Sequence, residues 1–234
     1  PAQPTAAVGP AHGGHYTPDM SNATTWSRAA PARLGVVSFL NSKPLIAGLA
    51  TDPRVHCLFD VPAALPKRLA AGEVDAALVP IIDVIRAAGA LHVISDACIG
   101  SDGETMTVRI FSQTPPDRIT ALAVDTDSHT SVALARVLWR ELYGRDLAVQ
   151  RIDARRADLT AETAVLLIGD KVVDPRRAGF AFEVDLGGAW RQHTGLPFVF
   201  AVWVARQPDA ELGAVLDAAR DRGVAQAAEI AAQQ

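Results

Sequence analysis

The chain has 234 residues, of which 49% are hydrophobic and 21% are charged, and its formal net charge is -4. This length allows one large domain or two small lobes, and the composition is that of an ordinary globular protein. The charge balance excludes the basic surface typical of nucleic-acid-binding proteins, Lys and Arg form no run suited to a membrane surface, and no apolar stretch is long enough to span a bilayer.

Residues 1–32 are rich in Pro, Ala, Gly, Ser and Thr and show no hydrophobic periodicity. This composition predicts a disordered N-terminal segment. The segment lacks the basic start and the apolar middle of a secretory signal, so we expect a cytoplasmic protein. In that compartment the two cysteines, Cys57 and Cys98, are expected to be buried free thiols, and their spacing indicates no metal site.

From residue 33 onward, apolar strand-like runs alternate with helix-like stretches. The predicted elements of a first set are strands at residues 33–39, 55–60, 75–80 and 91–99 and helices at residues 44–50, 62–71 and 81–88. The predicted elements of a second set are strands at residues 121–125, 148–152 and 165–168 and helices at residues 131–143 and 159–164. This alternation indicates an α/β fold with largely parallel sheets covered by helices.

Two further apolar segments, residues 106–112 and 197–205, do not fit one simple sheet. Because the alternation of strands and helices restarts between them, we predict two lobes joined by two crossing hinge strands, with a cleft at the hinge. Lobe one would comprise residues 33–112 and 199–234, and lobe two residues 113–198. The alternative is a single sheet with two long strands.

Polar residues follow the predicted strands at the points where ligands bind in open α/β sheets. Asn41 and Ser42 come directly after the first strand, and Asn41 offers both an amide donor and a carbonyl acceptor. Their alternative role is to cap the helix that follows. Thr107 begins the strand-like segment 106–112, where its hydroxyl could face the cleft.

Two more loops carry candidate ligand contacts. The hydroxyl residues Ser128, Thr130 and Ser131 precede or begin the helix predicted at 131–143. They can cap this helix, and together with its N-terminal amides they can also bind an anion. Gly169 and Asp170 follow the strand predicted at 165–168, where Gly169 allows close backbone approach.

The motifs FLNSKPL, SDGETMTV, DSHTSVAL, LLIGD and DLGGAWRQHTGLPFVFAVWVAR occur in this order from about residue 33 to the C-terminus. In them the chain resembles the chorismate dehydratases of the futalosine route to menaquinone. The resemblance implies a two-lobed fold of the type II periplasmic-binding-protein-like class in a cytoplasmic enzyme. That enzyme is a hydro-lyase that converts chorismate to 3-(1-carboxyvinyloxy)benzoate and water. The resemblance implies no metal or redox cofactor and no nucleic-acid or membrane partner, and it leaves the oligomeric state open.

The same resemblance implies residue roles. Asn41 matches the motif Asn that bonds the substrate near the reacting ring, and Thr107 matches a position that is commonly Ser; these two are the implied catalytic residues. The implied substrate-binding residues are Ser42, Ser128, Thr130, Ser131, Gly169 and Asp170. The enolpyruvyl carboxylate of the substrate itself is implied as the base.

The chain departs from the family pattern in four places. Thr107 adds a methyl group to the usual Ser, the sequence GETMT lacks a Pro that often follows the Gly, and His129 stands where Arg is frequent. Family members usually continue past the position of Gln234 with helices that pack on lobe one, so we expect a shorter lobe one here. Two alternative functions remain: a solute-binding protein that holds a small carboxylate, and the sister enzyme 1,4-dihydroxy-6-naphthoate synthase on the same scaffold.

Overall fold

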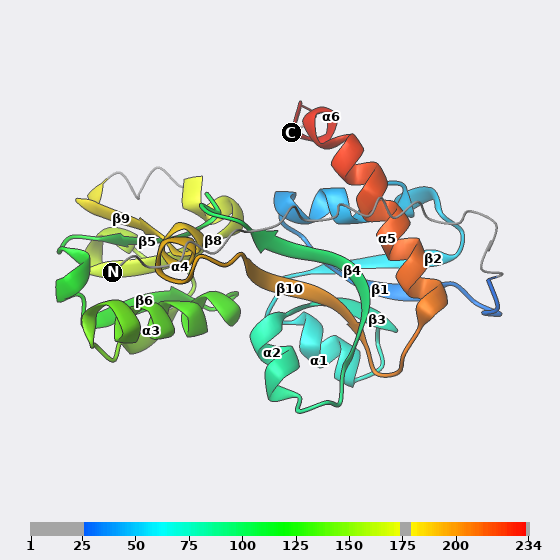
Figure 1. Ribbon diagram of the computed structural model, residues 1–234, viewed down its shortest axis with the longest axis horizontal. Helices are drawn as coiled ribbons and strands as arrows, with labels where there is room; N and C mark the ends of the chain where they lie inside the picture. The colour runs from blue at the N-terminus through cyan, green and yellow to red at the C-terminus, as the bar shows by residue number, and fades with distance from the viewer. Residues whose placement is uncertain (1–25, 174–178, 233–234) are drawn as a thin grey trace, which may run out of the picture.

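The computed structural model describes residues 26–173 and 179–232. Its strands form two five-stranded sheets, which lie in opposite halves of an elongated molecule (Figure 1). The strand order is β2-β1-β3-β10-β4 in the first sheet and β7-β6-β8-β5-β9 in the second. Helices accompany both sheets, so the predicted α/β class is observed.

In the first sheet, four strands run in one direction and β10 alone runs in the opposite direction, between β3 and β4. Its strands are β1 (Ala32–Val37), β2 (Val55–Asp60), β3 (Ala76–Pro80), β4 (His92–Ser101) and β10 (Phe198–Ala205). Its helices are α1 (Leu65–Ala70), α2 (Ile81–Arg86), α5 (Ala210–Ala225) and α6 (Ala227–Ala232), with 3-10 helices at Leu40–Ile46 and Leu49–Thr51. Every residue of β3 is buried, as expected of a central strand covered on both faces.

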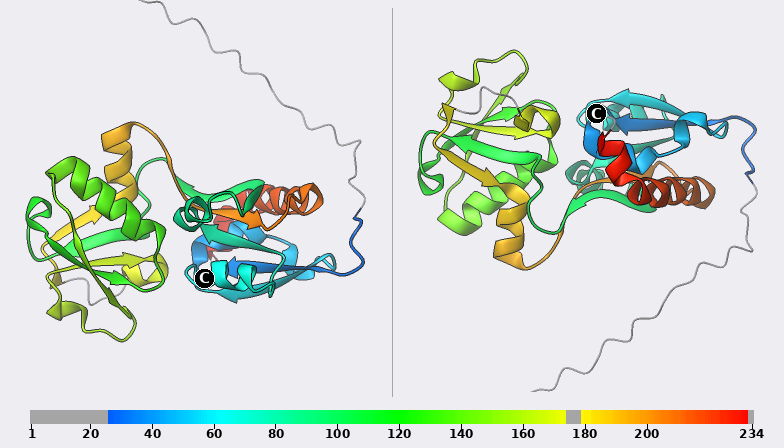
Figure 2. Two further views of the ribbon diagram at one scale, coloured as in Figure 1. Left: turned by 90° about the horizontal axis from the view of Figure 1, so that it is seen from below. Right: turned by 90° about the horizontal axis from the view of Figure 1, so that it is seen from above.

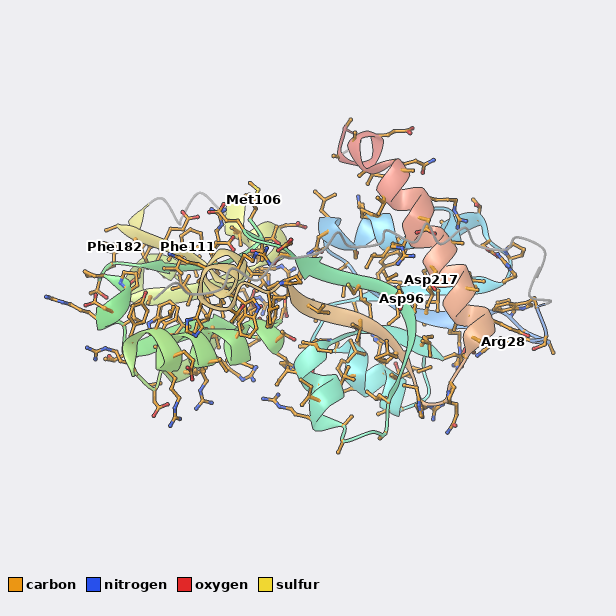
Figure 3. All side chains as sticks on the ribbon, in the orientation of Figure 1. Arg28, Asp96, Met106, Phe111, Phe182 and Asp217 are labelled. Atoms are coloured by element: carbon orange, nitrogen blue, oxygen red, sulfur yellow. The ribbon has the colours of Figure 1, made fainter. Side chains whose placement is uncertain are left out.

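The Asp217 carboxylate of helix α5 bonds to two groups of β4. Asp217 accepts hydrogen bonds from the Ser95 hydroxyl at 2.6 Å and from the Asp96 N–H at 3.0 Å. Figure 3 shows Asp96 and Asp217 close together where α5 crosses the sheet. The last long helix of the chain therefore packs on the first sheet.

The second sheet repeats the arrangement of the first, since β5 alone runs opposite to the other four strands, between β8 and β9. Its strands are β5 (Val108–Ser112), β6 (Ala121–Asp125), β7 (Ala148–Ile152), β8 (Ala164–Ile168) and β9 (Phe182–Asp185). Its helices are α3 (Thr130–Tyr143) and α4 (Leu186–Thr194), with 3-10 helices at Pro116–Arg118, Leu159–Ala161 and Gly169–Val173. Helix α3 ends at Gly144, whose φ of 62° is the left-handed conformation that commonly closes a helix.

The chain crosses between the sheets twice (Figure 2). It leaves the first sheet between Ser101 of β4 and Val108 of β5, and it returns between Gly195, the C-cap of α4, and Phe198 of β10. The segment predicted at 106–112 was assigned to lobe one, but β5 pairs with β8 and β9 of the second sheet. The hydrophobic pattern correctly indicated a strand, but it carries no information about the pairing partner.

Other elements differ locally from the prediction. The helix predicted at residues 44–50 is a pair of 3-10 helices, and Pro44 lies inside the first of them rather than at its start. The strand β9 and the helix α4 were not predicted. Residues 1–25 of the predicted disordered segment 1–32 lie outside the described residues, whereas Ala32 lies in β1 and Arg28 pairs with Asp209.

The predicted thiols are free, but both are half-buried rather than buried. Burial raises the pKa of the Cys57 and Cys98 thiols. Among residues 26–173 and 179–232, no helix has both the length and the apolar composition needed to cross a bilayer.

Candidate functional site

A cavity of about 440 Å³ lies between the two sheets. It is bordered by the segments that follow β1, β2, β6 and β8 and by the last residue of β3, because parallel strands bring their carboxyl ends to one edge of a sheet. Parts of β4 and β10 complete the wall. The apolar part of the lining includes Phe39, Leu45, Pro80, Ile99 and Phe200.

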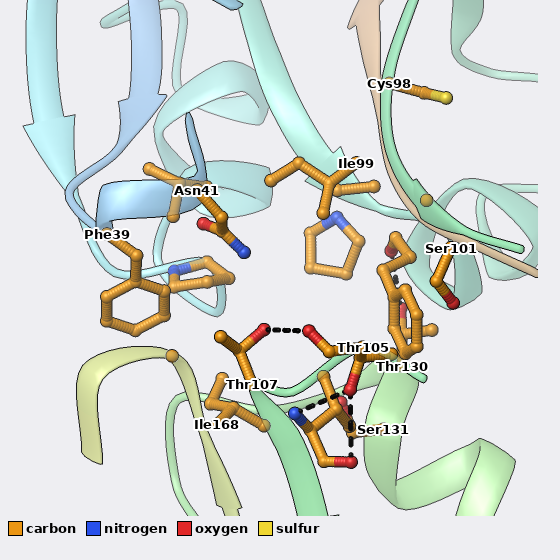
Figure 4. Close-up of a pocket in the computed structure, with 18 of the residues that line it drawn as sticks. Phe39, Asn41, Cys98, Ile99, Ser101, Thr105, Thr107, Thr130, Ser131 and Ile168 are labelled. Carbon is orange, nitrogen blue, oxygen red and sulfur yellow. Dashed lines mark hydrogen bonds between the residues drawn. The ribbon is translucent and has the colours of Figure 1, made fainter. Parts of the chain in front are cut away.

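Asn41 and Thr107 approach the cavity from opposite sides (Figure 4). Asn41 lies on the 3-10 helix Leu40–Ile46, whose N-cap is Phe39 and which has no side-chain cap. The alternative role of Asn41 as a helix cap therefore does not apply. Thr107 is held by its main chain, since its carbonyl accepts the Gly169 N–H at 2.8 Å. Its hydroxyl donates a long hydrogen bond of 3.4 Å to the Thr105 carbonyl.

Ser42 and Asp170 are the two predicted site residues that do not line the cavity. The Ser42 side chain is buried, and its hydroxyl is directed to the main-chain carbonyls of Val37 and Phe39. It stabilises the turn that presents Asn41. Asp170 is exposed, next to Gly169, which does line the cavity.

The N-terminus of α3 opens onto the cavity. Ser128, Thr130 and Ser131 are all buried and line it. The Thr130 hydroxyl donates to the Phe200 carbonyl at 3.1 Å, whereas the buried Ser128 hydroxyl has no hydrogen-bond partner in the described part of the chain. The N-cap residue His129 makes no side-chain cap hydrogen bond. The first-turn amides and the positive end of the helix dipole are therefore suited to an anion.

Charges around the cavity are paired. His129 is the only basic residue among the lining residues that the structure describes, and its Nδ1 lies 2.7 Å from the Asp83 carboxylate on α2. The contact joins the two halves of the molecule. Asp127 lies 2.5 Å from the Lys171 ammonium, and Asp102 lies 3.0 Å from Arg191. These two lining carboxylates are therefore occupied by cations.

Two groups near the cavity have shifted acidities. Burial raises the pKa of the Asp125 carboxyl, although the adjacent Lys171 favours its ionised form. The Cys98 thiol lines the cavity, and because burial raises its pKa it stays neutral near pH 7 and is a poor nucleophile. Within the described ranges, no group of three His, Cys, Asp or Glu side chains is arranged to hold a metal ion.

Sequence reasoning missed two hydroxyl residues of the cavity, Ser101 and Thr105, of which Thr105 donates its hydroxyl to Asp185 at 3.0 Å. Ser101 is not among the predicted site residues, but it lies at the end of β4 and lines the cavity. Its hydroxyl is buried without a partner among the residues that the structure describes. The available signal was its place at the carboxyl end of a predicted strand, the same signal that identified Asn41.

Residues 32–234 match a protein-family model described as menaquinone biosynthesis. The chain belongs to this menaquinone-biosynthesis family. It is 31% identical over 220 residues to the chorismate dehydratase of Thermus thermophilus, an alignment that covers 86% of this chain and 80% of that relative. The family resemblance inferred from the motifs is confirmed.

Solved structures show the same fold at low sequence identity. A protein from Archaeoglobus fulgidus has a TM-score of 0.66 and 13% identity, covering 86% of this chain and 78% of the other. The periplasmic aliphatic sulphonate binding protein of Escherichia coli has a TM-score of 0.55 and 16% identity, covering 88% of this chain and 76% of the other. The predicted periplasmic-binding-protein-like fold is confirmed.

Proposed function

We propose that this member of the family is a chorismate dehydratase, a hydro-lyase that converts chorismate to 3-(1-carboxyvinyloxy)benzoate and water. Family membership and the Thermus thermophilus relative support the proposal. The observation that carries it is the cavity, in which Asn41 and Thr107 face each other beside the N-terminus of α3.

The cavity matches the two kinds of surface that chorismate presents. Its ring is apolar and can lie among Phe39, Ile99 and Phe200. Its two carboxylates need hydrogen-bond donors, and the helix amides and the free Ser128 hydroxyl at α3 supply them. A buried hydroxyl without a partner is costly, so a bound carboxylate would relieve that cost.

The reaction breaks one ring C–H bond and the bond between the ring and its hydroxyl, and the proton and hydroxide leave as water. The ring becomes aromatic, which makes the overall change strongly downhill. The three carboxylates among the described lining residues are engaged in ion pairs, Asp127 with Lys171, Asp102 with Arg191 and Glu104 with Arg109 at 4.0 Å. This supports the substrate's own enolpyruvyl carboxylate as the base, with Asn41 and Thr107 positioning the reacting ring and stabilising developing charge.

The test is to incubate the purified protein with chorismate and to identify the product by chromatography. We expect 3-(1-carboxyvinyloxy)benzoate to accumulate at the rate at which chorismate disappears. Asn41→Asp provides the matched inactive control. Saturable chorismate binding without product would overturn the proposal and favour a solute-binding protein.

A further inference from the structure

Asp185 holds two separate parts of the chain with one carboxylate. It ends β9 and is the N-cap of α4, where its Oδ1 accepts the N–H groups of Gly187 and Gly188, each at 3.0 Å. The same carboxylate accepts the Thr105 N–H at 2.9 Å, the Thr105 hydroxyl at 3.0 Å and the Met106 N–H at 2.8 Å. The Arg109 Nε also donates to this carboxylate, at 3.3 Å. A helix cap needs only the first pair, so the three bonds from Thr105 and Met106 require a different explanation.

Those three bonds fix the segment directly before Thr107. Met106 has a φ of 62°, a left-handed conformation that is unfavourable for a long side chain. The Met106 side chain is 67% exposed, so packing does little to hold it there (Figure 3). The bond from its N–H to Asp185 is the contact that stabilises this conformation, and the conformation determines where Thr107 enters the cavity.

Helix α4 also packs directly on this segment. A Cβ atom on Gly187 would lie 2.5 Å from the Thr105 Cγ2 and 2.6 Å from both the Gly103 carbonyl oxygen and the Ser101 Oγ. The first turn of α4 therefore has no space for a side chain at residue 187. A Cβ on the neighbouring Gly188 would be tight only against the Glu104 side chain, at 3.1 Å, with the Asp185 Oδ1 and the Glu104 Cα at an ordinary 3.8 Å.

We propose that Asp185 is a positioning residue for Thr107 and that the N-terminus of α4 supports the segment before Thr107 by packing against it. Asp185 does not line the cavity, so it acts through residues 105 and 106 and not on the substrate. The catalytic part of this inference rests on the proposed function. Its structural part, that Asp185 holds the crossing segment between the sheets, does not.

The decisive variant is Asp185→Asn. Asn is as good a helix cap as Asp, so α4 remains capped. Oδ2, however, becomes an NH₂ group that meets the donors of the Thr105 hydroxyl, the Met106 N–H and the Arg109 Nε. We expect kcat for chorismate to fall by about tenfold or more with KM changed by less than about twofold, the pattern of a lost transition-state contact.

The matched control is Asp209→Asn at the N-cap of α5, where Asp209 accepts the Leu212 N–H at 2.9 Å. This cap lies away from the cavity, and we expect parental kcat and KM. A second matched pair tests the packing: Gly187→Ala should lower kcat, whereas Gly188→Ala should keep it because the Glu104 side chain can move. Equal kcat in all four variants would overturn the proposal.

Hydrogen exchange separates this inference from the proposed function. In the parent protein, the Thr105 and Met106 amides should be protected. In Asp185→Asn the Met106 amide, which bonds to the replaced Oδ2, should exchange faster while the Thr105 and α3 amides stay protected. This measurement needs no substrate. If the parent fails to convert chorismate, the proposed function fails and the exchange result still decides whether Asp185 holds the segment. Unchanged protection of the Met106 amide in Asp185→Asn would overturn that role.

Discussion

Gly169→Ala tests whether contact between the two halves shapes the cavity. Gly169 has a φ of 58°, and an added Cβ would lie 2.9 Å from two ring carbons of Phe39. Phe39 follows β1 of the first sheet and Gly169 follows β8 of the second, so the contact spans the cleft. The Phe39 ring is only 6% exposed and has little freedom to move away.

The expected cost has two parts. The left-handed backbone alone costs a non-glycine residue about 1–2 kcal/mol. Overpacking against the Phe39 ring adds about 1–3 kcal/mol if the closed arrangement is kept. If the two halves separate instead, the free energy of unfolding falls only by the backbone cost. The overpacking cost then weakens substrate binding, and KM rises about tenfold for each 1.4 kcal/mol.

Gly144→Ala is the matched control. Gly144 has a φ of 62°, and its added Cβ would meet no atom within 4 Å. Its free energy of unfolding should therefore fall only by the backbone cost, about 1–2 kcal/mol, and its KM should not change. The free energy of unfolding in urea and the chorismate kinetics of both variants give the two quantities.

A further substitution isolates the ring. Phe39→Leu shortens the side chain that meets the new Cβ, so it should recover part of the loss in a Gly169→Ala background. The coupling between the two substitutions measures the contact directly. The reasoning is refuted if Gly169→Ala matches Gly144→Ala in both stability and KM.

Three more predictions concern the cavity and its support. Asn41→Asp should lower turnover of chorismate by about a hundredfold or more with little change in melting temperature, because it places a negative charge opposite a dianion; parental turnover would remove Asn41 from the site. Thr107→Ser should keep or raise turnover and Thr107→Val should lose it, so an active Val variant would exclude a role for the hydroxyl. Burial opposes ionisation of Asp185, but hydrogen bonds from Thr105, Gly188 and Met106 outweigh it and lower its pKa. The pKa of Asp185 in the folded protein is therefore below the unfolded value of about 3.9, so the stability that its carboxylate contributes is present above that pH and is lost as pH falls. Urea unfolding in acid should show a shallower decline of the free energy of unfolding with falling pH for Asp185→Asn than for the parent. Identical slopes would contradict this.

The hydrophobic pattern along the chain determined most of the strands and helices. The strands predicted at 55–60, 121–125 and 148–152 have those bounds in the structure, because alternation and β-branched content are properties of the segment itself. Helix α3 begins one residue before its predicted start. Gly72 directly follows the helix predicted at residues 62–71 and has a φ of 71°, the left-handed conformation that glycine adopts without strain.

The sequence also indicated where a ligand would lie. Because the carboxyl ends of parallel strands share an edge, polar residues after separate strands were expected together, and Asn41 and Gly169 do lie around one cavity. Which hydroxyls reach that cavity was not determined. Ser42 and Ser101 are both serines beside strand ends, but Ser42 turns to main-chain carbonyls and Ser101 lines the cavity. Side-chain direction depends on the backbone path of each turn, which composition does not encode.

Only the tertiary structure decided the partners of distant segments. The pattern predicted β5 as a strand, but its place between β8 and β9 depends on residues more than fifty positions away. Asp185 shows the same dependence: its sequence context, Asp before two glycines, is that of a helix cap, and its bonds to Thr105 and Met106 span about eighty residues. Local propensity is a sum over neighbours in the chain, whereas pairing and packing are set by the competition among all surfaces that the folded chain can bury.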